Sequence, residues 1–168
     1  RVRENFEVNV FSNFEVVQLV IKQMIKQNHG RIIMIASLAG LFPIPFLSVY
    51  SATKSSIIMM TTALRFELSL LDTNVELVLV EPGLYHTGFN QVMRDNKFDF
   101  MNHQSLFREE LEMIKKYEPK IYRMLETDNL NSIVKKVERA ITKKHPKFIY
   151  RSRFSQIIGV KLFQIFFT

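Results

Sequence analysis

The chain has 168 residues, the size of one domain, and its 47% hydrophobic content supports a buried core and excludes a disordered protein. It carries a formal net charge of +7 and no cysteine, which excludes disulfides, thiolate chemistry and iron–sulfur clusters and favours a reducing compartment such as the cytoplasm. Its four histidines show no paired metal-binding spacing, so we expect no metal site.

The first half of the chain predicts helices that alternate with buried strands. Apolar residues recur at helical spacing over 9–27, and Asn28 and Gly30 then suit a helix end. Short apolar runs at 31–36 and 75–81 predict buried parallel strands, with a helix over 49–71 between them. This order is typical of an α/β fold, here a partial Rossmann-like parallel sheet with flanking helices.

Beyond residue 88 the pattern changes to that of a helical substrate region. We expect a polar loop to about residue 104, amphipathic helices over 106–125 and 130–141, and a last strand within HPKFIY, residues 145–150. We therefore treat 1–168 as a single domain. Its parts are a catalytic core portion (1–87), substrate-lid helices with the last strand (88–150), and a basic, apolar tail (151–168).

The positive charge lies in the second half of the chain. Residues 1–87 carry 7 Lys+Arg and 7 Asp+Glu, whereas residues 88–168 carry 16 and 9. No nucleic-acid-binding motif or aromatic platform accompanies this charge, so we expect no nucleic-acid partner. The tail 151–168 fits peripheral contact with a membrane surface. Packing of the tail on the domain, or on a second copy in a homo-oligomer, is an equal alternative.

The stretch SVYSATKSS places Tyr50 four residues before Lys54 in the predicted second helix. Residues four apart are neighbours on a helix, so their polar ends can meet in one cleft. The pKa of a free tyrosine is near about 10, and a nearby cation such as Lys54 is expected to lower it for acid/base work at neutral pH. Alone, the pair is a weak motif, because two residues that merely share a helix face explain it equally well.

Further residues stand at characteristic distances from this pair. Ser37 ends the first predicted strand, 13 residues before Tyr50, and Asn9 lies 28 residues before Ser37 in the context NVFS. The turn PGLYHT, Pro82 to Thr87, follows the second strand. Together these features resemble the short-chain dehydrogenase/reductase family over residues 9–87. Singly, each feature has a structural alternative. Ser37 can be a turn former, Asn9 a helix cap, Pro82-Gly83 an ordinary loop turn and Thr87 the N-cap of the following segment.

The resemblance implies an oxidoreductase that uses NAD or NADP to interconvert an alcohol and a ketone or aldehyde. In the family, the tyrosine exchanges the proton, the serine hydrogen-bonds the substrate oxygen, the lysine bonds the nicotinamide ribose and the asparagine helps hold a proton-relay water. These catalytic roles are expected for Tyr50, Ser37, Lys54 and Asn9. The resemblance also implies cofactor contacts by Tyr50, Lys54, Pro82, Gly83, Leu84 and Thr87.

The loop after Ser37 is notably apolar and predicts a lipophilic substrate. We expect substrate contacts from Ser37, Leu38, Phe42 and Phe46. The context VEPG and the closing HPKFIYR resemble the hydroxysteroid and retinol dehydrogenase branch of the family. The alternative is that the aromatic loop residues pack as core.

The glycine-rich cofactor turn that opens this family has no counterpart here. The five glycines, at 30, 40, 83, 88 and 159, never form Gly-x-Gly, so the chain resembles the C-terminal two-thirds of such an enzyme. We expect residues 1–168 alone to bind the cofactor weakly and to expose an apolar sheet edge. A second hypothesis follows: a non-catalytic lipid-binding or interaction protein derived from a truncated dehydrogenase.

Overall fold

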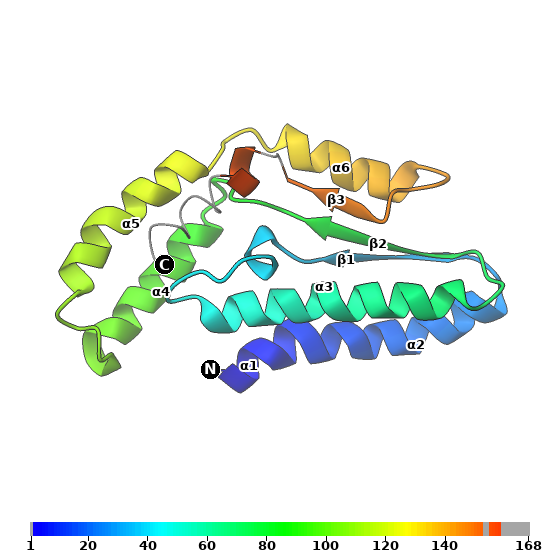
Figure 1. Ribbon diagram of the computed structural model, residues 1–168, viewed down its shortest axis with the longest axis horizontal. Coiled ribbons are helices and arrows are strands. Elements are labelled where there is room, and N and C mark those ends of the chain that lie inside the picture. Colours follow the sequence, from blue (N-terminus) through cyan, green and yellow to red (C-terminus); the bar gives the residue numbers. More distant parts are fainter. Residues whose placement is uncertain (1, 153–154, 159–168) are drawn as a thin grey trace.

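In the computed structural model, which describes residues 2–152 and 155–158, helices cover both faces of a three-stranded parallel sheet (Figure 1). The strands are β1 (Gly30–Ile35), β2 (Val75–Glu81) and β3 (Ile149–Arg151), in the order β1-β2-β3. The register pairs Ile35 with Val80 and Glu81 with Arg151. The predicted α/β class with a parallel sheet is confirmed, and all three strands end on the same side.

The N-terminal segment is helical from Val2 to Lys26. It comprises α1 (Val2–Phe6), a π-helical turn η1 (Glu7–Phe11) and α2 (Ser12–Lys26). The predicted helix over 9–27 is therefore present but begins earlier, and Asn9 lies in its π-helical turn. The turn that follows α2 contains Asn28, whose positive φ of 54° is tolerated by asparagine and whose side chain accepts a hydrogen bond from Asn74 N at 2.8 Å.

Helix α3 (Ser48–Ser69) packs with α2 on one face of the sheet. Apolar side chains of both helices bury against those of β1 and β2, including Val17, Ile57 and Leu79. This shared core holds the first turns of α3 beside the carboxyl end of β1. On the other face, α6 (Asn131–Thr142) packs on β2 and β3 through Ile133 and Ala140.

The predicted polar loop over 88–104 is wrong, because Phe89–Gln104 form helix α4. Its buried side carries Met93, Lys97 and Met101 at intervals of four residues. In the sequence, Lys97 interrupts this apolar spacing with a charged residue. Its side chain is nevertheless only 8% exposed, and it forms an ion pair with Glu118 of α5 (Leu111–Leu125). Helix α5 begins later than predicted, after a turn over 106–110.

Among residues 2–152 and 155–158, none of the helices contains an apolar stretch of the length that spans a bilayer. The membrane or packing contacts expected of the tail 151–168 depend mostly on residues 153–154 and 159–168, which lie outside the described residues. Within the described part of the tail, Arg151 belongs to β3, and Gln156 is buried.

Candidate active site

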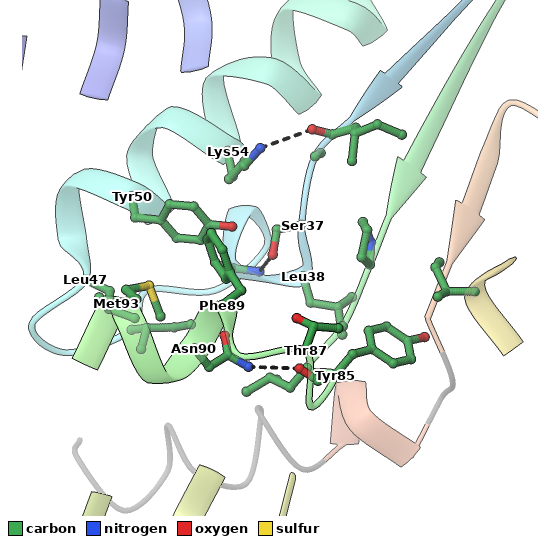
Figure 2. Close-up of a pocket in the computed structure, with 18 of the residues that line it drawn as sticks. Ser37, Leu38, Leu47, Tyr50, Lys54, Tyr85, Thr87, Phe89, Asn90 and Met93 are labelled. Atoms are coloured by element: carbon green, nitrogen blue, oxygen red, sulfur yellow. Dashed lines mark hydrogen bonds between the residues drawn. The ribbon is translucent and has the colours of Figure 1, made fainter. Parts of the chain in front are cut away.

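A cavity of about 420 Å³ lies at the carboxyl ends of β1 and β2, where parallel α/β sheets place their ligands. Figure 2 shows the side chains of Ser37, Tyr50 and Lys54 directed into one region of it. The predicted site residues that line the cavity are Ser37, Leu38, Tyr50, Lys54, Pro82, Gly83, Leu84 and Thr87. Segments far apart in sequence therefore meet where both strands end.

Ser37 caps the short 3-10 helix η2 (Leu38–Gly40) that follows β1. Its Oγ accepts a hydrogen bond from Ala39 N at 3.1 Å, which is the turn-forming role left open by the sequence. The next residue, Leu38, donates its N–H to Pro82 O at 2.9 Å. The serine turn and the Pro-Gly turn are thus tied together, and Ser37 Oγ still faces the cavity.

Gly40 allows η2 to lie directly against α3. A Cβ added at this position would come within 2.7 Å of Lys54 C, 2.8 Å of Lys54 O and 2.8 Å of Ile58 Cδ1. Because a helix backbone cannot move aside as a side-chain tip can, the turn that carries Ser37 would have to move instead.

We expect Gly40→Ala to destabilise the fold by about 1–3 kcal/mol, the usual cost of overpacking. It should also lower any activity that depends on Ser37, because the displaced turn increases the separation of Ser37 from Tyr50. Urea unfolding of the variant and the parent protein measures the first effect. Unchanged stability would contradict the close packing of η2 on α3.

Burial governs the acid/base character of Tyr50. Loss of water around the phenol raises the pKa of Tyr50, and a hydrogen bond with the Ser37 side chain opposes that rise without cancelling it. The expectation that Lys54 holds this pKa down is therefore wrong for this arrangement. Lys54 Nζ lies 5.9 Å from the Tyr50 ring centroid and donates to Ile35 O at 3.1 Å, rather than to the phenol oxygen.

Lys54 itself is partly buried, and this burial lowers its pKa. The hydrogen bond to Ile35 O holds the amine at the end of β1, on the same cavity as Ser37 and Tyr50. The cavity therefore brings together the Tyr50 phenol, which remains protonated at neutral pH, the Ser37 hydroxyl and the Lys54 amine. Such a set can donate a proton to a carbonyl oxygen and hydrogen-bond that oxygen at the same time.

Asn9 does not line the cavity. Its Nδ2 donates to Thr53 Oγ1 at 3.2 Å, and the Thr53 hydroxyl donates to Tyr50 O at 2.8 Å. The asparagine therefore contacts the backbone of the Tyr50 turn through one buried threonine. A π-helical turn is often found at functional sites, and here it is the local feature that includes Asn9.

The two aromatic residues expected to touch substrate lie away from this cavity. Phe46 lines a neighbouring cavity and meets Phe107 edge-on, with ring centroids 5.5 Å apart. Phe42 lines neither cavity.

The sequence interpretation missed Asn90 and Tyr122, which both line the cavity that contains Tyr50. Asn90 lies in the segment that was predicted to be a loop, and Tyr122 lies on α5, which no local motif connects to Tyr50.

In the described part of the chain, no cluster of three or more acidic or histidine side chains could hold a metal ion.

Comparison with known proteins identifies the group to which this fold and cavity belong. The family described as short chain dehydrogenase matches residues 1–97, more than half of the chain. The chain belongs to the short-chain dehydrogenase family. This result confirms the resemblance that was read from Asn9, Ser37, Tyr50, Lys54 and the Pro-Gly turn.

Two curated relatives illustrate the similarity. Estradiol 17-beta-dehydrogenase 11 of Macaca fascicularis is 34% identical over 90 residues, which are 53% of this chain and 30% of the relative. Ketoacyl reductase HetN of a Nostoc strain is 40% identical over 82 residues, which are 49% of this chain and 28% of the relative. The match thus spans less than a third of the length of these relatives.

Solved structures show the same fold over a larger part of the chain. A short-chain dehydrogenase from Streptomyces avermitilis has a TM-score of 0.64 at 15% identity, covering 99% of this chain and 58% of that chain. A short-chain dehydrogenase/reductase from Burkholderia phymatum, solved in complex with NAD, has a TM-score of 0.68 at 22% identity, covering 94% and 55%. At these identities the likeness concerns the fold alone.

Proposed function

We propose that the complete protein containing this chain is an oxidoreductase that uses NAD or NADP to interconvert a lipophilic alcohol and its ketone or aldehyde. The observation that carries the proposal is the meeting of Ser37, Tyr50 and Lys54 in one cavity at the strand ends of a short-chain dehydrogenase fold. Family membership favours this function over the second hypothesis of a non-catalytic lipid-binding protein.

Tyr50 is the proposed general acid in the reduction and general base in the oxidation. Its phenol donates a proton to the carbonyl oxygen, and the Ser37 hydroxyl hydrogen-bonds the same oxygen as negative charge develops on it. In the reverse direction the phenolate accepts the alcohol proton. Asn9 is proposed to act through Thr53 on the position of the Tyr50 turn.

The groups around the cavity fit one end of a nicotinamide cofactor. Thr87 offers a hydroxyl, Lys54 offers an amine, and the Pro82–Leu84 segment offers backbone groups, all on the cavity wall. When bound, such a cofactor supplies or accepts the hydride. We propose that Tyr50, Lys54, Pro82, Gly83, Leu84 and Thr87 contact it.

The lipophilic substrate is supported by the other walls of the cavity. They are formed largely by apolar side chains, which include Leu38, Ile44, Leu47, Phe89 and Met93. Apolar walls with a few convergent polar groups are typical of sites for small lipophilic ligands. One relative is named for estradiol and another for a ketoacyl group.

Titration of the complete protein with NADH and NADPH, followed by assays of octan-2-one reduction with these cofactors and of octan-2-ol oxidation with NAD⁺ and NADP⁺, tests this function. We expect cofactor binding and cofactor-dependent turnover in at least one direction. Absence of both, together with binding to anionic liposomes, would instead support the non-catalytic lipid-binding hypothesis.

The raised pKa of Tyr50 predicts different pH profiles for the two directions. Reduction needs the protonated phenol, so its kcat/KM should remain flat from about pH 6 to 9. Oxidation needs the phenolate, so its kcat/KM should rise about tenfold per pH unit up to at least pH 10, the ordinary tyrosine pKa. A plateau of the oxidation rate near pH 7 would contradict this assignment.

A further inference from the structure

A second cavity, of about 440 Å³, adjoins the one that contains Tyr50. It lies between α5 and the segment 44–46, and Phe107 also contributes to its wall. Three residues, Ile44, Leu84 and Tyr122, line both cavities, so the two spaces are neighbours across these side chains. A molecule that extends beyond the first cavity past this shared wall would enter the second.

The wall of the second cavity is made almost entirely of carbon atoms. Apolar side chains of α5 form most of one side, among them Met113, Ile114, Ile121 and Leu125. The charged side chains that line it are both acidic, Glu110 and Glu118. The walls therefore suit a hydrocarbon, whereas an anionic group would lose water there without gaining a cation among the lining residues.

An ion pair between neighbouring helices holds this wall in place. Glu118 of α5 pairs with Lys97 of α4, and their side chains are 15% and 8% exposed. Lys97 Nζ also lies 5.8 Å from the centroid of the Phe46 ring, which forms part of the opposite wall. Lys97 therefore contacts both sides of the cavity, and its charge is balanced by Glu118.

We propose that this second cavity binds the uncharged hydrocarbon tail of an elongated substrate whose reacting carbinol or carbonyl lies beside Tyr50. The inference rests on the proposed function, because it uses the same site for the reacting end. It adds a substrate class, which is long aliphatic alcohols and ketones without a terminal carboxylate. Each methylene that leaves water should improve binding about fourfold until the cavity is filled.

Methionine methyl groups report the two cavities separately. Met93 lines the first cavity and Met113 the second. In the complete protein labelled with [13C-methyl]methionine, butan-2-one should shift only the Met93 signal, whereas dodecan-2-one should shift both. This measurement needs no turnover, so it can succeed or fail independently of the proposed oxidoreductase activity.

A Met113 signal that does not respond to dodecan-2-one overturns the proposal. It is also overturned if Met113 responds only after residues 159–168 are removed, because the chain's own end would then be the occupant. Finally, 11-oxododecanoic acid should bind at least tenfold more weakly than dodecan-2-one. Equal binding would contradict the exclusion of anionic tails.

Filling the second cavity should change chain-length preference. Ile121→Trp is expected to lower kcat/KM for dodecan-2-ol at least tenfold and to leave that for butan-2-ol within twofold. Met124→Trp on the same helix is the matched control, because Met124 is 84% exposed and does not line the cavity. Ile114→Phe is a second filling variant if Ile121→Trp fails to fold. Equal losses for both alcohols would overturn the proposal.

Discussion

Tyr50→Phe is expected to lower kcat of the complete protein by about 10²–10⁴-fold, which is the usual contribution of a general acid/base. The variant removes one oxygen atom, the phenol oxygen that is proposed to exchange the proton. The aromatic ring remains and keeps its contact with Phe89, whose ring centroid lies 6.3 Å away. We therefore expect the fold to change little.

Tyr122→Phe provides the matched control for this experiment. Tyr122 lines the same cavity, and burial together with nearby Glu118 raises its pKa well above the ordinary tyrosine value. Tyr122 is not among the residues proposed to exchange the proton or to hydrogen-bond the substrate oxygen, so removal of its hydroxyl should change kcat less than tenfold. Steady-state kinetics of both variants compares their kcat values, and circular dichroism checks that both are folded. Near-normal turnover of Tyr50→Phe would exclude Tyr50 as the proton donor.

Arg151→Met is expected to destabilise the protein by about 3–5 kcal/mol, the cost of leaving a buried charge unpaired. Glu81, at the end of β2, is fully buried, and Arg151 Nε of β3 donates to its Oε2. The other carboxylate oxygen, Oε1, is buried without a hydrogen-bond partner among the described residues. Loss of the arginine would leave a carboxylate in the core with no compensating charge.

The damage should extend to the active site, because Pro82 and Gly83 follow Glu81 directly. The double variant Arg151→Met with Glu81→Gln should recover much of the lost stability, since it removes the buried charge together with its partner. Urea unfolding of the two single variants and the double variant measures this coupling. Simple additivity of the two single effects would show that Glu81 and Arg151 are not energetically paired.

Much of the fold could be predicted because local patterns and burial agree along the first 87 residues. The β-branched runs at 31–36 and 75–81 form β1 and β2 with boundaries shifted by at most one residue. The helix over 49–71 forms α3 for the same reason. The carboxyl ends of parallel strands lie at the same edge of a sheet. Ser37 and the Pro-Gly turn were therefore expected to lie close together.

Helix α4 could not be predicted because its stability depends on a contact between helices. Lys97 interrupts the apolar stripe of this segment, and its burial becomes favourable through the ion pair with Glu118, 21 residues away. The position of Phe46 also depends on the tertiary structure. Its φ is 61°, and its side chain lines the second cavity rather than the one beside Tyr50. No short-range sequence pattern predicts the Lys97–Glu118 ion pair or the conformation of Phe46.

The sequence by itself determined the family, and its resemblance to that family singled out Ser37, Tyr50 and Lys54, which line one cavity at the strand ends. The tertiary structure alone decided the pKa direction of Tyr50, the place of Asn9 behind Thr53, and the second cavity along α5. These properties depend on how much water each group loses and on which distant residue fills the space beside it, and both quantities exist only once the elements are packed.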